Sequence, residues 1–335
     1  MAIFSDIYHL IVSLRYHLYR YGIKPTYRLP AKVISIGNIT MGGTGKTPAA
    51  IAVAEEAVKR GYKPCILTRG YKGIKPGMSF VSKGGVPLLS SIEAGDEPVL
   101  MAHKLTCVEI IKGKKRYYAG QMASDDVNLF ILDDGFQHLS LHRDFDVLLI
   151  DSVDPFGRRP GRLFPEGRLR EPLSAMKRAD IIVMTKSTGK DDAELRKTIK
   201  EYNQSAPLYW AFHKPTSFVD KNWHTFDLSS IKGKRVFAFA GIAASDSFTG
   251  ILTSLGAHIV RFKKFRDHYR YRRSDINRLI MESRGIRLIT TEKDLVRLKG
   301  LDIPDNLWAL AIEFDIDKSF YDLLLGHGPD NNNLA

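Results

Sequence analysis

Short apolar runs alternate with helical stretches along most of the chain. Several runs are apolar at nearly every position, as in strands buried on both faces of a parallel sheet; they are Val33–Ile36, Cys65–Thr68, Val127–Leu132, Val147–Ile150 and Ile181–Met184. Stretches with helical spacing lie between them, at Pro48–Arg60, Glu97–Lys104, Pro172–Arg178 and Asp192–Tyr202. This alternation predicts an α/β fold with a doubly wound, mostly parallel sheet.

A second, shorter series of the same kind follows a segment without clear periodicity around Trp210–Ile231. Its strand runs are Val236–Ala240, Ile259–Phe262, Leu288–Thr290 and Leu307–Ile312, with helices near Ser247–Leu255 and Asp275–Ser283. We therefore expect a main domain over 23–212, a linker over 213–233 and a smaller α/β domain over 234–325. The last ten residues, 326–335, are expected to be disordered.

The first 22 residues have a different pattern. Their apolar side chains recur at the helical period and form one stripe, Ile3, Phe4, Ile7, Leu10, Ile11, Leu14 and Leu18. Asp6, Arg15 and Arg20 interrupt the apolar run, so the segment matches neither a transmembrane helix nor a signal peptide. Residues 1–22 are predicted to form an amphipathic helix that lies either on a bilayer or on the protein itself.

The composition is that of a globular protein with a strong positive charge. Of the 335 residues, 44% are hydrophobic and 26% are charged, and the length allows two domains. The formal net charge of +13 favours a polyanionic partner, and nucleic acid, anionic lipid and phosphorylated metabolites all fit. Two cysteines, Cys65 and Cys107, are too few for a disulfide framework or a zinc site, which indicates a reducing cytosol.

The clearest chemical motif is a glycine-rich loop between the first predicted strand and the helix that follows it. Such a loop turns backbone N–H groups toward phosphate oxygens, and the helix terminus favours negative charge. Lys46 would contact the β- and γ-phosphates, and the Thr47 hydroxyl would reach Mg²⁺. The loop predicts a P-loop NTPase-like core, and its candidate nucleotide-binding residues are Met41, Gly42, Gly43, Thr44, Gly45, Lys46, Thr47 and Pro48.

This loop is a variant of the usual pattern. The chain has Thr40 where the strict pattern has glycine. It has Met41 where partitioning-type ATPases carry a lysine, which argues against that group.

Two adjacent acids follow the strand run at Val127–Leu132. Asp133 and Asp134 stand where a P-loop protein holds Mg²⁺, directly or through water. Two acids exceed that need, so one of them would orient the other or a bound water. The alternative is that they cap a helix after a core strand. Thr47, Asp133 and Asp134 are thus the candidate metal ligands, and ATP and Mg²⁺ are the expected cofactors.

Three other polar segments have no clear role by themselves. Arg69-Gly70-Tyr71 ends a strand run, and Asp96 either caps a helix or approaches the phosphate site beyond the carboxyl ends of the strands. The stretch 157–172 would form either a solvated loop or a site for an acceptor that already carries phosphate. Its arginines are Arg158, Arg159, Arg162, Arg168 and Arg170.

Taken together, the polar motifs resemble those of the tetraacyldisaccharide 4′-kinase (lipid A 4′-kinase) family of Gram-negative bacteria. Any one of them is common, but their order along the chain, from the N-terminal helix to about Phe314, is specific. The chain departs from the family pattern at Glu166 and Arg168, where a small residue and a proline are more usual. The motifs are Gly37-Asn38, Gly42–Pro48, Arg69-Gly70-Tyr71, Gly95–Pro98, Asp133–His138, Leu169–Pro172 and Thr291–Asp294.

The resemblance implies transfer of the ATP γ-phosphate, with Mg²⁺, to the 4′-hydroxyl of a tetraacylated glucosamine disaccharide 1-phosphate in lipid A biosynthesis. It also implies a smaller P-loop-like domain that does not bind nucleotide productively. The family's catalytic acid corresponds to Asp96, which would accept the hydroxyl proton or position the hydroxyl. Its histidine partner corresponds to His268, and Lys46 is the third catalytic residue. Because Asp96 and His268 lie on different predicted domains, catalysis would depend on domain closure. The substrate-binding positions correspond to Asn38, Arg69, Tyr71, Gln137, Arg170 and Glu171.

Under this interpretation, an acylated disaccharide phosphate and an anionic membrane leaflet account for the positive charge. No nucleic acid and no obligate protein partner are expected. The protein would be peripheral on the cytoplasmic face of the bacterial inner membrane, with residues 1–22 as its membrane-associating helix. One alternative is a nucleotide-switched, membrane-associated binding protein. Another is a nucleic-acid-binding NTPase, suggested by the aromatic residues Phe265, Tyr269 and Tyr271 among arginines.

Overall fold

The computed structural model describes residues 2–157, 161–186, 193–243 and 245–329, with side chains described from Phe4 onward. Some residues used in the sequence predictions lie outside these ranges, namely Arg158, Arg159, Asp192 and the end of the expected tail at 330–335.

The described residues form helices and strands in alternation, as the apolar pattern predicts. The strands are β1 (Lys32–Gly37), β2 (Pro64–Thr68), β3 (Ser79–Lys83), β4 (Glu109–Lys112), β5 (Leu129–Asp133), β6 (Phe145–Asp151), β7 (Ile181–Thr185), β8 (Leu208–Val219), β9 (Thr225–Phe226), β10 (Arg235–Ala240), β11 (His258–Lys264), β12 (Arg287–Thr291) and β13 (Leu307–Ile316). The α-helices are α1 (Ala2–Arg20), α2 (Lys46–Lys59), α3 (Ser91–Ala94), α4 (Asp96–Lys104), α5 (Arg116–Gly120), α6 (Ala193–Tyr202), α7 (Ser245–Ser254), α8 (Arg273–Ser283), α9 (Glu292–Leu298) and α10 (Lys318–Leu325).

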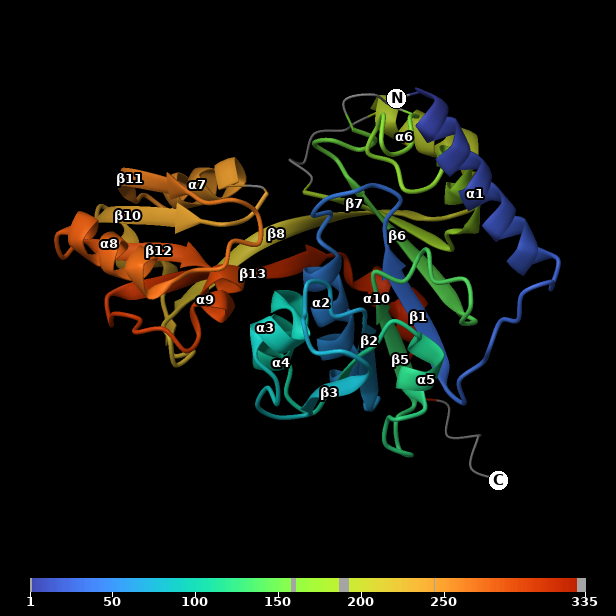
Figure 1. Cartoon of the computed structure of the whole chain (residues 1–335), viewed down its shortest axis with the longest axis horizontal. Coiled ribbons are helices and arrows are strands. Elements are labelled where there is room, and N and C mark those ends of the chain that lie inside the picture. The colour runs from blue at the N-terminus through green and yellow to red at the C-terminus, as the bar shows by residue number, and fades with distance from the viewer. Residues whose placement is uncertain (1, 158–160, 187–192, 244, 330–335) are drawn as a thin grey trace.

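Within the described residues, all strands belong to one sheet that runs through two units (Figure 1). The strand order is β11-β10-β12-β13-β8-β7-β6-β1-β5-β2-β4-β3, and β9 pairs with β8. In the larger unit, β7, β6, β1, β5, β2 and β4 are parallel, and β3 is an antiparallel edge strand. The predicted doubly wound, mostly parallel α/β fold is therefore confirmed.

The register of the larger unit brings the carboxyl ends of four neighbouring strands together. β1 lies between β5 and β6, so Ile36 is paired with both Asp133 and Val147. β2 pairs with the other side of β5, where Leu67 is level with Leu132. Because ligands of open α/β sheets bind beyond the carboxyl ends of the strands, this edge is the expected place for a site.

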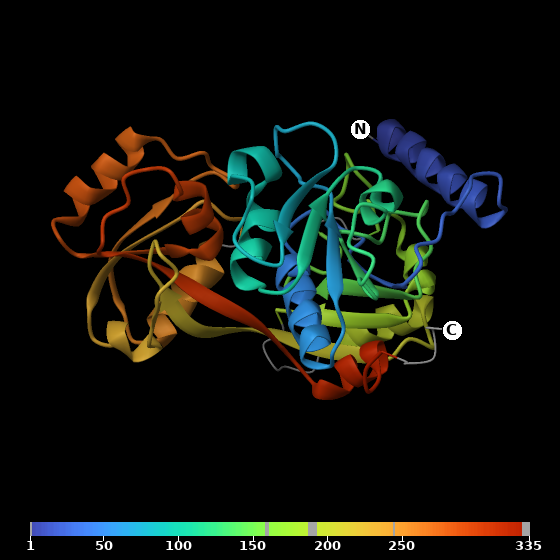
Figure 2. The same ribbon diagram turned by 90° about the horizontal axis from the view of Figure 1, so that it is seen from below.

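Two long strands connect the units, which differs from the mixed segment that the sequence suggested around Trp210–Ile231. The start of β8 pairs in parallel with β7, and the rest of it pairs antiparallel with β13. Figure 2 shows both strands running from one unit into the other. Most side chains of β8 are only partly buried, so the strand lacks the apolar run or strict alternation by which strands are recognised.

Helix α10 also differs from the expected division, because the sequence placed it with the smaller unit. In the structure, Phe320 and Leu324 pack against α2 in the core of the larger unit. The Lys32 ammonium donates to the Leu324 carbonyl at 2.6 Å, and the Tyr62 hydroxyl donates to the Leu325 carbonyl at 2.7 Å. The chain thus returns to the larger unit through β13 and ends on it. The predicted helix Pro172–Arg178 is a 3-10 helix over Leu173–Arg178.

Helix α1 lies along the outside of the larger unit, away from the smaller unit (Figure 1). One face packs on the protein, where the Ser5 hydroxyl donates to the Leu163 carbonyl and the Tyr8 ring meets Phe164 edge-on. Most of the predicted apolar stripe is on the opposite face and is exposed, with Phe4 at 66%, Leu10 at 69% and Leu14 at 56%. Leu18 is half-buried, and the side chain of Ile3 lies outside the described part. In the described part of the chain, no helix has both the length and the apolar character to cross a membrane.

Candidate active site

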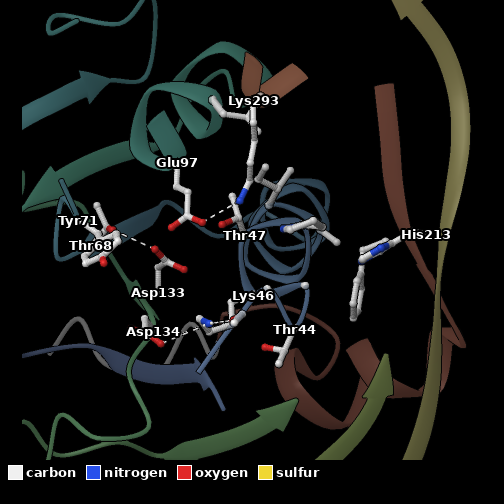
Figure 3. Close-up of a pocket in the computed structure, with 18 of the residues that line it drawn as sticks. Thr44, Lys46, Thr47, Thr68, Tyr71, Glu97, Asp133, Asp134, His213 and Lys293 are labelled. Atoms are coloured by element: carbon white, nitrogen blue, oxygen red, sulfur yellow. Dashed lines mark hydrogen bonds and ion pairs between the residues drawn. The ribbon is translucent and has the colours of Figure 1, made fainter. Parts of the chain in front are cut away.

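A cavity of 1920 Å³ lies beyond the carboxyl ends of the strands and is bordered by both units. The larger unit contributes the glycine loop, the ends of β2 and β5, and the start of α4. The smaller unit contributes His268 and the first residues of α9. Figure 3 shows Lys46, Glu97, Asp133 and Lys293 pointing into the same space.

The glycine loop has the conformation that phosphate binding requires. Gly42 and Gly45 have φ angles of 124° and 85°, in a region that residues with a side chain avoid. Gly45 is the N-cap of α2, so the first amides of that helix point toward the cavity. Thr44 Oγ1 is buried and has no hydrogen-bond partner. All predicted nucleotide-binding residues, Met41 to Pro48, border the cavity.

Asp133 and Asp134 lie at the end of β5 and have different surroundings. Oδ2 of Asp133 accepts a hydrogen bond from Thr68 at 2.9 Å, whereas its Oδ1 is buried without a partner. Asp134 pairs with Arg170 at 2.9 Å and with Lys46 at 3.6 Å. The chain after β5 continues in turns, so these acids do not cap a helix.

The charges of this pair fit a bound cation. Burial, with the nearby charges of Glu97 and Asp134, raises the pKa of Asp133 to about 7. Burial opposes ionisation of Asp134 as well, but Lys46 and Arg170 lower its pKa. Among the described residues, no group of three or more His, Cys, Asp or Glu side chains could hold a metal ion by itself. Mg²⁺ commonly takes one or two carboxylates and completes its shell with phosphate oxygens and water.

Part of the arginine-rich stretch is ordered against the glycine loop. The Met41 amide donates to the Arg168 carbonyl at 2.7 Å, and the Arg170 amide donates to the Ile39 carbonyl at 2.7 Å. The Arg168 guanidinium also donates to the Met41 carbonyl, at 3.1 Å from its Nε. Arg168, one of the two residues that depart from the family pattern, therefore contacts the phosphate loop directly. Of the two interpretations of this stretch, a plain solvated loop does not describe residues 168–170.

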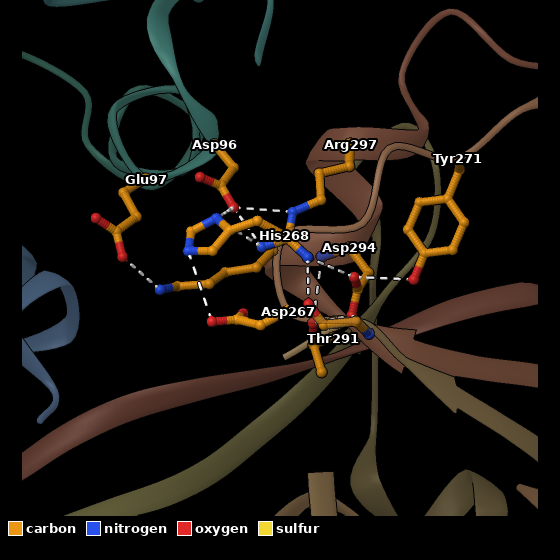
Figure 4. A network of polar contacts seen from close by, with 10 residues as sticks. Asp96, Glu97, Asp267, His268, Tyr271, Thr291, Asp294 and Arg297 are labelled. Atoms are coloured by element: carbon orange, nitrogen blue, oxygen red, sulfur yellow. Dashed lines mark hydrogen bonds and ion pairs between the residues drawn. The ribbon is translucent and has the colours of Figure 1, made fainter. Parts of the chain in front are cut away.

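Asp96 and His268 are in contact although 172 positions separate them in the sequence. Asp96 is the first residue of α4, and the N-cap position of that helix is taken by Gly95. Instead, His268 Nδ1 lies 3.0 Å from Asp96 Oδ2 (Figure 4). Burial disfavours the charge of Asp96, but the hydrogen bond from His268 and the charge of Arg297 hold its pKa well below its usual range. The helix-capping interpretation of Asp96 is therefore wrong.

The two members of this pair are not equally accessible. His268 borders the cavity and has a φ angle of 57°, in the left-handed region. Asp96 lies behind it, with a side chain that is 6% exposed. The Tyr71 ring stands edge-on to the imidazole at 5.8 Å. Because ionised Asp96 can only accept hydrogen bonds, Nδ1 carries the proton in this contact.

The predicted substrate-binding residues divide into two groups. Arg69, Tyr71, Gln137 and Arg170 border the cavity. Asn38 and Glu171 are buried, at 0% and 4% exposure, and do not border it. The Gln137 amide donates to the Asn38 carbonyl at 2.8 Å and to Glu171 at 3.4 Å, so these two residues support Gln137 from below.

Sequence reasoning missed several residues of the site. His213 on β8 lies beside Gly45, and its buried Nε2 has no hydrogen-bond partner. Burial, with the charge of Lys186, lowers the pKa of His213 to about 4. No local pattern marks a lone histidine on a half-buried strand. Lys293 belongs to the Thr291–Asp294 motif but was given no role. Arg297 was missed, although it follows that motif by one helical turn, a spacing that places side chains together.

Comparison with known proteins agrees with the order of the motifs. Residues 1–328 match the family described as tetraacyldisaccharide-1-P 4′-kinase. A tetraacyldisaccharide 4′-kinase of Syntrophus aciditrophicus (strain SB) is 37% identical over 344 residues, which cover 97% of this chain and 91% of the relative. One from Geobacter sulfurreducens is 39% identical over 304 residues, which cover 90% and 84%.

A solved structure is similar over the same length. It is the crystal structure of LpxK from Aquifex aeolicus in complex with ATP, with a TM-score of 0.81 and 33% sequence identity. The similarity covers 98% of each chain. From the family match, the relatives and the shared fold, it follows that this chain belongs to the tetraacyldisaccharide-1-P 4′-kinase family.

Proposed function

We propose that this chain transfers the γ-phosphate of ATP to the 4′-hydroxyl of a tetraacylated glucosamine disaccharide 1-phosphate. The observation that carries the proposal is that the glycine loop and His268, from different units, border one cavity. A phosphate-binding loop and a proton-accepting pair are what phosphoryl transfer to a hydroxyl needs. The acceptor follows from the family, whose members are named for it.

On the nucleotide side, Lys46 and the amides at the start of α2 bind the phosphates. Thr47, Asp133 and Asp134 would hold Mg²⁺, and the buried, unpartnered Oδ1 of Asp133 supports this assignment. When bound, the ion neutralises charge on the phosphate oxygens. Lys46, now 3.6 Å from Asp134, exchanges part of that contact for the γ-phosphate.

On the acceptor side, Asp96 and His268 act as one unit on the 4′-hydroxyl. Asp96 keeps the proton of the imidazole on Nδ1, which leaves Nε2 as the nitrogen that can take the hydroxyl proton. Arg69, Gln137 and Arg170 lie on the same cavity wall and suit an acceptor that already carries a phosphate. The pair exists only while the units are in contact, so catalysis depends on their closure.

The membrane surface is the proposed place of action, on the cytoplasmic face of the inner membrane. The exposed stripe of α1 supports this, because it faces away from the protein while the other side of the helix is packed. An amphipathic helix of this kind buries its apolar face at the boundary of headgroups and acyl chains. The net charge of +13 adds attraction to an anionic leaflet.

The activity is tested with γ-labelled ATP, Mg²⁺ and detergent-dispersed tetraacyldisaccharide 1-phosphate. We expect label in the lipid at the 4′-position, and none when the 4′-hydroxyl of the acceptor is already phosphorylated. ATP binding without transfer would instead support a nucleotide-switched binding protein. Salt-dependent binding to DNA at physiological ionic strength would support a nucleic-acid-binding NTPase.

The role of α1 gives a separate prediction. We expect Leu10→Gln with Leu14→Gln to lower partitioning onto anionic vesicles by about 10²-fold or more, since each buried leucine contributes about 1.5–3 kcal/mol. Both side chains are exposed, so the fold and ATP binding should be unchanged. Vesicle sedimentation at low and high salt measures the partitioning.

The control is His9→Gln with His17→Gln, on the polar side of the same helix. It should sediment with vesicles like the wild type. If the leucine variant also does so at both salt concentrations, α1 is not the main membrane anchor.

A further inference from the structure

Helices α4 and α9 belong to different units and are joined by ion pairs. Both helices begin at the cavity and contact each other. In that contact, each charged side chain of α4 faces a side chain of opposite charge on α9. These side chains are largely buried, so their charges are weakly screened. The pairs are Arg297 with Asp96, Lys293 with Glu97 at 2.7 Å, and Lys104 with Glu292 at 2.9 Å.

Arg297 differs from the other partners because it contacts the proposed catalytic pair. Its Nε donates to Asp96 Oδ2 at 2.8 Å, and its Nη2 contacts the same oxygen. Nη2 also lies 3.5 Å from His268 Nδ1. Asp96 Oδ2 thus receives both the guanidinium of Arg297 and the imidazole of His268 (Figure 4).

The guanidinium is itself held from behind. Nη1 of Arg297 donates to Asp294 Oδ1 at 2.8 Å and to the Gly241 carbonyl at 2.7 Å. Asp294 is fully buried and also accepts from the Tyr271 hydroxyl at 3.0 Å and the Thr291 hydroxyl at 2.7 Å. The smaller unit therefore fixes the position of Arg297 through its own residues, independently of Asp96.

We propose that Arg297, anchored by Asp294, is a positioning residue that places the Asp96 carboxylate against His268 when the two units meet. This rests on the proposed phosphoryl transfer. The fork of guanidinium N–H groups fixes the direction of Oδ2, and Oδ2 in turn fixes the imidazole through Nδ1. Arg297 touches neither nucleotide nor acceptor, since it does not border the cavity.

The test compares Arg297→Gln, which removes the charge, with Arg297→Lys, which keeps it. We expect Arg297→Gln to lower kcat by about 10²-fold, the lower end of what a proton-accepting group supplies, with the KM for ATP changed by less than about threefold. Arg297→Lys should recover most of this loss, to within about tenfold of the wild type. In an Asp96→Asn background, Arg297→Gln should lower kcat little further, because Arg297 acts through Asp96.

If Arg297 only held α4 and α9 together, Arg297→Gln would lower kcat by the same factor in the Asp96→Asn background as in the wild type, and the proposal would be wrong. A kcat for Arg297→Gln close to that of the wild type would also overturn it. If Arg297→Gln does not fold, Asp294→Asn replaces it, with the same loss of kcat expected and wild-type kcat contradicting the proposal.

One readout does not depend on transfer. The Nδ1–H proton of an imidazole bound to a carboxylate resonates far downfield in proton NMR, and Asp96→Asn assigns it by its loss. We expect this resonance in the wild type and in Arg297→Lys, and its loss or broadening in Arg297→Gln; an unchanged resonance there would contradict positioning by Arg297. Absence of label in the lipid with wild-type protein would contradict the proposed function instead.

Discussion

Lys46→Ala is expected to lower phosphoryl transfer by about 10²–10³-fold or more. The ammonium group stands at the start of α2, 3.5 Å from the Gly42 carbonyl and 3.6 Å from Asp134. A charge in that place stabilises the γ-phosphate more strongly in the transition state than in the ground state, so kcat should fall most. Initial rates of label transfer from ATP at saturating acceptor measure the effect.

Lys63→Ala is the matched control, since Lys63 lies just beyond the same helix, does not border the cavity and has a side chain that is 63% exposed. It should retain wild-type turnover and the same melting temperature. If Lys46→Ala keeps more than about a tenth of wild-type turnover, the γ-phosphate does not lie at this loop.

Asp96 and His268 give the second large effect. We expect Asp96→Asn and His268→Ala each to lower kcat by about 10²–10⁴-fold while the KM for ATP changes little. Asn keeps the shape of Asp96 but cannot carry the charge that holds the proton on Nδ1 of His268. The double variant should be close to the worse single variant, because a base and the group that orients it act as one unit.

His258→Ala is the control for this pair, because His258 is exposed on β11 of the same unit. It should leave kcat unchanged. Rate losses that multiply in the double variant would mean that Asp96 and His268 act separately, even if both are important. A salt-sensitive KM for the lipid with intact kcat in His268→Ala would indicate that His268 serves only as a surface charge.

The sequence by itself determined the strands of the larger unit and the nucleotide loop. Strands such as β1 and β5 are buried on both faces, so nearly every position is apolar and the run is visible without a structure. The glycine loop is contiguous, and its chemistry depends on backbone conformation that glycine at fixed spacing encodes. Asp133 and Asp134 could also be predicted from the sequence, because they stand at the end of a buried strand.

Elements with mixed surroundings could not be predicted in this way. β8 pairs with two different strands, and most of its side chains are only partly buried. Its sequence of apolar and polar residues therefore matches neither a helix nor a strand. α10 lies next in sequence to the smaller unit but packs on α2, because β13 carries the chain back across the sheet. Sequence order therefore misassigned it.

The assembly of the active site depends on tertiary contacts that the sequence does not reveal. Periodicity and turn chemistry describe neighbours within a few residues, whereas Asp96 meets His268 across 172 positions and Arg297 across 201. Asp96 at a helix start has the same local pattern whether it caps the helix or faces another unit. The path of β8 and β13 brings α9 and His268 against α4, and this determines which residues contact Asp96. In this fold, the Asp96 carboxylate pairs with His268 and Arg297 of the other unit.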